Sequence, residues 1–100
     1  MGETSGAGLR RMGYRFGGEC QGVGFRYNTE HIANGLGITG WVRNEFDGTV
    51  SAELQGTSEQ LAAFLGKLTE TYARWHVDWR IAEAEELEPL PDEAGFSIRF

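Results

Sequence analysis

The stretch Ile38–Gln55, ITGWVRNEFDGTVSAELQ, holds two apolar-rich segments separated by a turn signal. In its second half, apolar residues recur at every second position from Val50 to Leu54, which is typical of a half-buried strand. The dipeptide Asp47-Gly48 between the two halves accepts positive φ in a tight turn. The stretch therefore predicts a β-hairpin with strands over residues 38–44 and 49–55.

A strand, a glycine loop and a helix are expected before this hairpin. Apolar residues alternate with polar ones over residues 12–20, which favours a half-buried strand. Over residues 25–36 the apolar positions fall on one helical face, and Gly37 follows at the place where a left-handed residue ends a helix. The two segments are joined by a short loop that contains Gly22 and Gly24.

A second helix and two more strands are expected after the hairpin. Thr57 or Ser58 can cap a helix whose apolar residues recur at spacings of three and four from Leu61 to Tyr72. Alternation over residues 77–82 predicts a strand, and residues 96–100 predict a short last one. The acidic segment between them, 83–91, contains both prolines and is interpreted as a loop or a sheet edge.

This order, β-α-β-β-α-β with a short last strand, predicts an α+β fold of the ferredoxin-like kind. In that plan two split βαβ units form an antiparallel sheet with both helices on one face. One hundred residues suffice for a single domain with one modest core. Residues 11–100 are expected to form that domain, and residues 1–10, small and polar, a flexible tail.

The overall composition indicates which binding partners and which cellular compartment are expected for this protein. The formal net charge of −6 disfavours nucleic acid, whose backbone needs a basic face. A single cysteine fits a reducing compartment, and the sequence lacks a run of about eighteen apolar residues that could span a membrane. We therefore expect a cytoplasmic protein without a membrane partner, and a monomer as the simplest assembly.

The segment Cys20-Gln21-Gly22-Val23-Gly24-Phe25-Arg26 carries the clearest chemical signal in the chain. Two glycines within three positions allow a turn in which several N–H groups point at one spot. A helix start directly behind adds unpaired N–H donors and the positive end of its dipole. Arg26 adds a fork of donors suited to phosphate or carboxylate. These features predict an anion cradle, although Gly-x-Gly before a helix is often only a tight turn.

Asn44 is the second candidate, because it ends the first strand of the hairpin. The first two strands of a split βαβ unit run parallel, so Cys20 and Asn44 are expected at the same sheet edge. There the Asn44 amide could hold a water molecule near a bound anion, although asparagine is also a common turn residue. The spacing of His31, His76 and Cys20 matches no metal pattern, so no metal site and no cofactor are expected. Cys20 is interpreted as a packing residue and not as a nucleophile.

Taken together, these blocks closely resemble the acylphosphatase family. The matching positions are Gly18, Gln21-Gly22-Val23-Gly24-Phe25-Arg26, Ala33, Leu36-Gly37, Gly40-Trp41-Val42-Arg43-Asn44, Asp47-Gly48 and Val50. They cover about half of the chain, and the spacing between the blocks fits the family pattern without a gap.

The resemblance implies an enzyme that hydrolyses acyl phosphates to a carboxylate and inorganic phosphate without a metal ion. It assigns phosphate binding to Arg26 and to the backbone N–H groups of Gln21, Gly22, Val23, Gly24 and Phe25, and the orientation of water to Asn44. Arg26 and Asn44 would then be the catalytic residues. The alternative is a non-catalytic module of the same fold that binds an acyl or carbamoyl phosphate.

Overall fold

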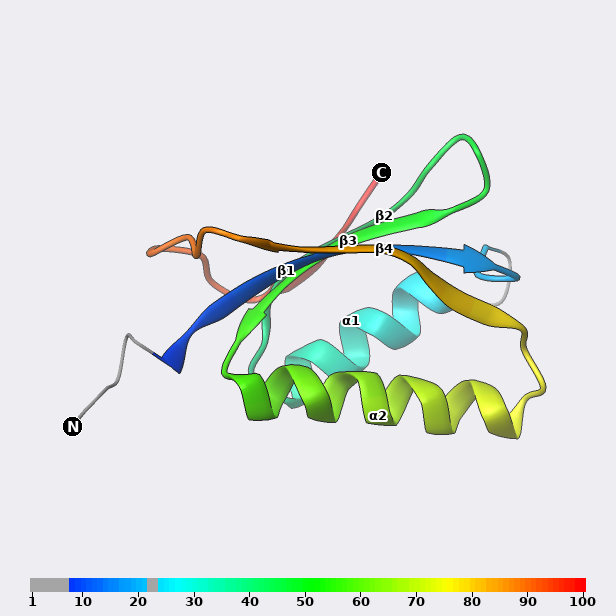
Figure 1. Ribbon diagram of the computed structural model, residues 1–100, viewed down its shortest axis with the longest axis horizontal. Coiled ribbons are helices and arrows are strands. Elements are labelled where there is room, and N and C mark those ends of the chain that lie inside the picture. Colours follow the sequence, from blue (N-terminus) through cyan, green and yellow to red (C-terminus); the bar gives the residue numbers. More distant parts are fainter. Residues whose placement is uncertain (1–7, 22–23) are drawn as a thin grey trace.

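The computed structural model describes residues 8–21 and 24–100, and the elements below are those of that part of the chain. Two helices and five strands follow in the order β1, α1, β2, β3, α2, β4, β5 (Figure 1). The bounds are β1 Arg10–Gly18, α1 Phe25–Gly35, β2 Thr39–Asn44, β3 Val50–Gly56, α2 Ser58–Arg74, β4 Trp79–Leu87 and β5 Phe96–Arg99.

The strands form one sheet in the order β4-β1-β3-β2-β5. β1 and β2 both pair antiparallel with β3, so they run parallel to each other on its two sides, as predicted. The predicted antiparallel arrangement holds for the first four strands. The short β5 departs from it by pairing parallel with β2, with Arg43 opposite Arg99, so the sheet is mixed.

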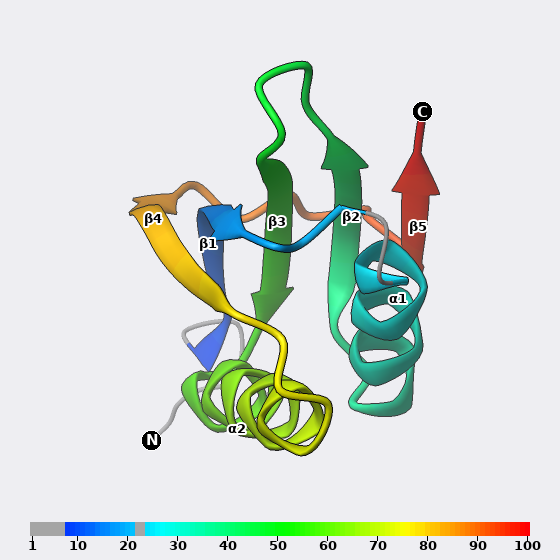
Figure 2. The same ribbon diagram turned by 90° about the vertical axis from the view of Figure 1, so that its right-hand side faces the viewer.

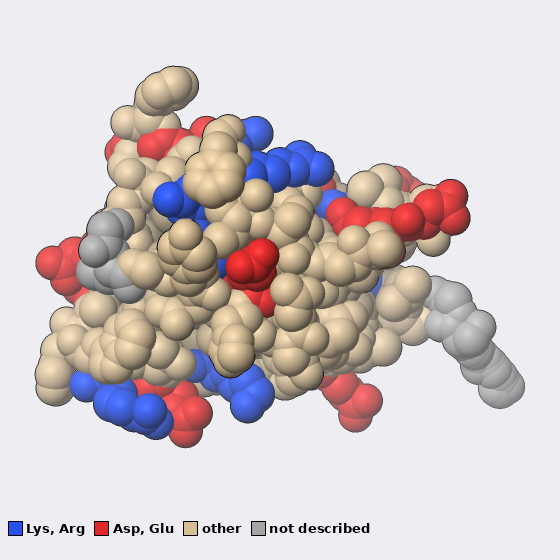
Figure 3. Space-filling view, turned by 180° about the vertical axis from the view of Figure 1, so that it is seen from behind, with Lys and Arg blue, Asp and Glu red and all other residues tan. Residues whose placement is uncertain are grey.

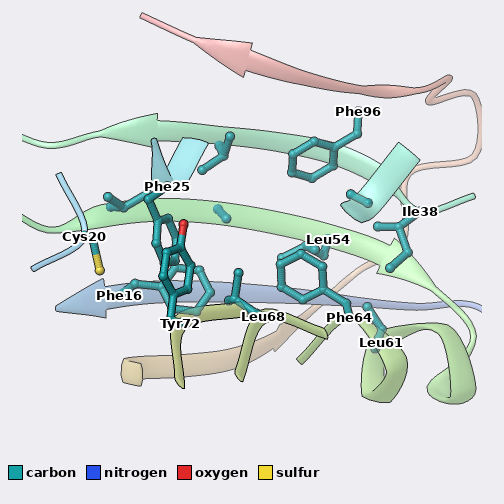
Figure 4. Close-up of a cluster of buried hydrophobic side chains, with 14 residues drawn as sticks. Phe16, Cys20, Phe25, Ile38, Leu54, Leu61, Phe64, Leu68, Tyr72 and Phe96 are labelled. Atoms are coloured by element: carbon teal, nitrogen blue, oxygen red, sulfur yellow. The ribbon is translucent and has the colours of Figure 1, made fainter. Parts of the chain in front are cut away.

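Both helices cover the same face of the sheet, which confirms the ferredoxin-like plan (Figures 1 and 2). The core lies between these two layers and is built from aromatic and aliphatic side chains of every element except β4 (Figure 4). Its members are Phe16, Cys20, Phe25, Ala33, Ile38, Val42, Val50, Ala52, Leu54, Leu61, Phe64, Leu68, Tyr72 and Phe96.

The helix ends follow the local sequence closely. Thr57 caps α2 with a reciprocal pair of bonds: its Oγ1 accepts from the Gln60 N–H at 3.1 Å, and Gln60 Oε1 accepts from the Thr57 N–H at 2.7 Å. α1 ends at Gly35 with Leu36 as its C-cap residue, and Gly37 follows in the left-handed conformation with φ 76°. Both features match the predictions made from the residue types.

β4 is longer than predicted and begins later. The strand predicted over residues 77–82 runs from Trp79 to Leu87, so it includes much of the acidic segment, where it forms a sheet edge. Its register against β1 shifts between Arg15 and Phe16, where Glu83 and Ile81 are the respective partners. Such a bulge interrupts the alternation with a period of two on which strand prediction depends. β4 nevertheless continues through this segment, because the backbone of β1 pairs with it.

The face of the sheet opposite the helices is partly covered by residues 88–95, which connect the two outermost strands. Arg11 lies under this connection and is only 1% exposed. Its guanidinium donates to Glu53 at 2.9 Å, to Glu93 at 2.7 and 3.1 Å, and to Gln55 at 3.1 Å. Gln55 in turn exchanges two hydrogen bonds with the backbone of Leu90. The sequence pattern, which predicted only that β1 is half-buried, did not indicate this cluster.

Two further observations concern the start of β1 and the length of the helices. β1 begins at Arg10, inside the stretch predicted to be a tail, and residues 1–7 of that tail lie outside the described part. Neither α1 nor α2, the helices of the described residues, is long and apolar enough to cross a lipid bilayer.

Candidate active site

A cavity of about 260 Å³ opens where the loop after β1 meets the start of α1 and the end of β2. Seven described residues line it: Cys20, Gln21, Gly24, Phe25, Arg26, Tyr27 and Asn44. The two features that the sequence analysis selected, the segment leading to Arg26 and Asn44 at the end of β2, therefore meet at one site. The topology is the cause, because β1 and β2 run parallel and end at the same edge of the sheet.

The start of α1 has the features of an anion-binding helix end. Gly24 is the N-cap residue in the left-handed conformation, with φ 73° and ψ 22°, which residues with a Cβ adopt at a cost. A glycine cap provides no side-chain acceptor for the N–H groups of the first turn, and that turn contains no acidic residue. The positive end of the helix dipole thus faces the cavity without an internal counter-charge from this turn.

The Phe25 side chain anchors this helix start to the core. Its ring is buried and lies 5.2 Å from the ring of Phe16 and 5.3 Å from that of Tyr72, with which it is stacked. Trp79 contacts it from β4 at 6.4 Å between centroids. Phe25 can therefore contribute only its backbone to a ligand, and its ring fixes where that backbone lies (Figure 4).

Side-chain and backbone hydrogen bonds hold the loop between β1 and α1 from two sides. Gln21 Nε2 donates to the carbonyl oxygens of Glu45 at 2.8 Å and Thr49 at 3.0 Å, which ties the loop to the β2–β3 turn. The Glu19 N–H donates to the Asp78 carbonyl, where a Cβ on Gly18 would clash. The Gln21 side chain is thus a tether of the loop, a role that sequence reasoning missed.

Arg26 makes no ion pair with any residue in 8–21 or 24–100, and other arginines engage the two acidic residues of the β2–β3 turn. Glu45 is paired with Arg43 at 3.1 Å, and Asp47 with Arg15 at 3.4 Å. A hydrogen bond from Ser51 and the one from Arg43 keep the pKa of the Glu45 carboxyl below its usual value. The charge of Arg26 is thus not neutralised by an ion pair among the described residues, and it is available to a ligand.

Asn44 carries a buried acceptor with no partner. Its Oδ1 is shielded from solvent and accepts no hydrogen bond from the described residues, while the residue lines the cavity. Leaving a buried carbonyl unpaired costs roughly 1–3 kcal/mol, so such an atom is expected where a ligand or ordered water completes it. Thr29, one turn after Arg26, has the second unpaired buried oxygen within residues 8–21 and 24–100.

Cys20 lines the cavity but is not suited to nucleophilic attack. The residue is fully buried, and its Sγ donates to the Gly17 carbonyl at 3.2 Å. Burial raises the pKa of the thiol to about 11, so at neutral pH it is protonated. This agrees with the interpretation of Cys20 as a packing residue. Across the described residues, no group of three His, Cys, Asp or Glu side chains is arranged to hold a metal ion.

Five of the seven predicted site residues lie in the described part of the chain and all five line the cavity: Gln21, Gly24, Phe25, Arg26 and Asn44. Gly22 and Val23 lie outside the described residues. Tyr27 also lines the cavity, and Phe100 contacts Arg26 from the far end of the chain. No spacing rule links residues 26 and 100, so the sequence held no signal for that contact.

Comparison with known families agrees with this geometry. The family model described as Acylphosphatase matches residues 12–98. The chain belongs to the acylphosphatase family. An acylphosphatase of Rhizobium etli is 43% identical over 77 residues, which are 77% of this chain and 82% of that protein. An acylphosphatase of Geobacillus kaustophilus is 39% identical over 83 residues, covering 78% of this chain and 88% of that protein.

A solved acylphosphatase extends the comparison to three dimensions. The crystal structure of acylphosphatase from Bacillus subtilis superposes with a TM-score of 0.71 at 27% identity, covering 92% of this chain and 99% of that one. The acylphosphatase fold is therefore shared over nearly the whole chain.

Proposed function

We propose that this protein is an acylphosphatase that hydrolyses the carboxyl–phosphate bond of acyl phosphates to a carboxylate and inorganic phosphate. The observation that carries the proposal is the cavity in which three unsatisfied groups converge. Among the described residues, these are the start of α1 without a side-chain cap, Arg26 without a carboxylate partner, and Asn44 with an unpaired buried oxygen. Two of them suit an anion, and the third suits water.

The phosphoryl group would bind at the start of α1. Backbone N–H groups of the loop and first turn would donate to its oxygens, aided by the helix dipole. The guanidinium of Arg26 would add donors in a fixed fork, which matches two phosphoryl oxygens at once. Both interactions strengthen as charge builds up on these oxygens during transfer, and this is the requirement for catalysis by binding.

Asn44 would orient the attacking water. Its Oδ1 can accept a hydrogen bond from a water O–H and so direct the oxygen lone pair of that water toward phosphorus. An amide does not take up a proton near neutral pH, so Asn44 acts through position and not as a base. In this role its oxygen gains the partner that the described residues do not supply.

The transfer of the phosphoryl group to water then requires no further catalytic group of the protein. The water oxygen forms a bond to phosphorus, the bond from phosphorus to the acyl oxygen breaks, and its electron pair leaves with the carboxylate. A phosphoryl oxygen of the substrate takes the water proton. A carboxylate is a good leaving group, so neither a covalent nucleophile nor a metal ion is required by this scheme.

Hydrolysis of benzoyl phosphate in the presence of a chelator tests the proposal, with the wild type compared with Asn44→Ala. We expect wild-type turnover, a kcat about 10²-fold lower in Asn44→Ala, and nearly unchanged inhibition by inorganic phosphate. A loss of phosphate binding in Asn44→Ala as large as that in Arg26→Ala would overturn the division of roles, in which Arg26 binds phosphate and Asn44 orients water. Phosphate binding without turnover in the wild type would instead support the non-catalytic binding module.

Further expectations accompany this function. The protein would act as a monomer in the cytoplasm on a small molecule, with no nucleic acid partner. These statements stay predictions.

A further inference from the structure

Tyr27 is the cavity residue that the proposed reaction leaves without a role. The other described residues of the lining are assigned to the phosphoryl group and to water, tether the loop, are buried, or have no side chain. Tyr27 is 69% exposed although it lines the cavity, so its ring lies at the opening and not at the floor. The reaction likewise leaves the acyl group of the substrate without a partner.

Exposed aromatic rings gather around this opening. Four aromatic residues are largely exposed in the part of the chain that the structure describes: Tyr27, Phe46, Trp75 and Phe100. Phe46 lies two residues after Asn44 in the β2–β3 turn, and Phe100 directly follows β5, which pairs with β2. The start of α1, the ends of β2 and β5 and the β2–β3 turn lie on one side of the molecule (Figure 2). Exposed apolar side chains that cluster in this way are typical of a binding surface.

Hydrogen bonds fix the backbone on both sides of Phe46 and tie it to the site. The Glu45 N–H donates to the Thr49 carbonyl at 2.9 Å, and the Asp47 carboxylate accepts from the Thr49 N–H at 3.0 Å. Gln21 Nε2 joins the same turn to the loop of the cavity. Phe46 is fully exposed, so no described residue covers its ring. Figure 3 shows this turn as the projection at the upper left of the molecule, with a tip that is neither acidic nor basic.

We propose that Tyr27 and Phe46 form an apolar rim for the acyl group, and that the protein prefers acyl phosphates with an aromatic or longer apolar acyl group over acetyl phosphate. This inference rests on the proposed binding of the phosphoryl group at the start of α1. One bridging oxygen joins the two parts of an acyl phosphate, so the acyl group must lie directly outside the phosphoryl site. Tyr27 follows Arg26 in the chain and lines the same opening.

The chemistry of the rim decides which acyl groups gain from it. An apolar group that covers an exposed ring removes apolar surface from water, and a second ring adds a favourable offset or edge-to-face contact. The methyl group of acetyl phosphate offers little surface for either interaction. The acyl group keeps these contacts while the phosphoryl group is transferred, so the rim raises kcat/KM for the larger substrates.

The test uses two pairs of ligands that differ in the size of the apolar group. Benzoyl phosphate and acetyl phosphate are compared by kcat/KM, and benzylphosphonate and methylphosphonate, which are not hydrolysed, are compared by calorimetry. The variants are Tyr27→Ala, Tyr27→Phe, which keeps the ring, and Phe46→Ala. Leu90→Ala is the control, since Leu90 is an exposed apolar residue of the connection 88–95 and does not line the cavity.

We expect the wild type to favour the larger member of each pair about tenfold, the effect of one or two aromatic contacts. Tyr27→Ala should reduce this preference about three- to tenfold and Phe46→Ala about twofold, while Tyr27→Phe and Leu90→Ala should retain it.

A wild type without the preference, or a preference that Tyr27→Ala leaves unchanged, would overturn the inference. Equal losses in Tyr27→Ala and Tyr27→Phe would also overturn it, because the ring would then not be the cause. Calorimetry measures the preference without turnover. A wild type that prefers benzylphosphonate but hydrolyses neither acyl phosphate would therefore refute only the proposed function.

Discussion

Two arginines at opposite ends of the sheet have contrasting surroundings. Arg11 is buried on the outer face and donates to Glu53, Glu93 and Gln55, so the fold itself satisfies its charge and its donors. Arg26 lies at the cavity, makes no ion pair within the described part of the chain, and lies against the aromatic ring of Phe100. The difference indicates which arginine supports the fold and which is kept for a ligand. Three changes can break or sharpen this comparison.

The largest expected effect is on activity. Arg26→Ala should lower kcat/KM for benzoyl phosphate about 10³-fold, because the fork that stabilises the transferred phosphoryl group is lost. Arg26→Lys should also be poor, since a point charge cannot replace two parallel donors. The free energy of unfolding, measured by urea titration, should stay close to that of the wild type. A large loss of stability in Arg26→Ala would show that this arginine also supports the fold.

The next effect is on stability. Arg11→Ala should lower the free energy of unfolding by about 3 kcal/mol, because it leaves the partly buried Glu53 and Glu93 without their counter-charge. Activity per folded molecule should be retained. Arg10→Ala is the control, since the neighbouring arginine forms only an exposed pair with Glu86 at 2.9 Å and its loss should matter much less. If the Arg10 variant were as unstable as the Arg11 variant, burial would not be the cause.

The smallest effect is the pH dependence of the Arg11 cluster. Burial alone would raise the pKa of the Glu93 carboxyl, but hydrogen bonds from Arg11 and Thr39 outweigh it and leave that pKa below its ordinary value. A carboxyl with a lowered folded pKa contributes stability that is present above its unfolded pKa, about 4.3. That contribution is lost as pH falls through the folded value.

Glu93→Gln tests this dependence. The variant should lose about 1.5 kcal/mol of stability at pH 7, and the difference from the wild type should shrink as pH falls below about 4. Urea unfolding at a series of pH values measures both. A difference that stays constant with pH would show that the ionised carboxylate contributes nothing beyond its packing.

The sequence by itself determined the features that depend on near neighbours in the chain. The cap of α2, the turn at Asp47-Gly48 and the left-handed Gly37 after α1 are local. The sequence predicted the turn and Gly37 directly and the cap as Thr57 or Ser58, of which the structure has Thr57. The meeting of Arg26 with Asn44 was also predictable, because strand direction alone brings both to one sheet edge. Within the site, the sequence could predict the residues whose roles depend on a motif or on the order and direction of the strands.

Only the tertiary structure decided the features that join distant residues. Residues 83–87 extend β4 because β1 offers backbone hydrogen bonds to any neighbouring chain, whatever the side-chain pattern. Arg11 is buried because the connection 88–95 lies over it, and that path has no local signal. Phe100 reaches Arg26 through the parallel pairing of β5 with β2. Side-chain periodicity records which face of a strand is apolar, and it carries no information about which distant segment will cover it.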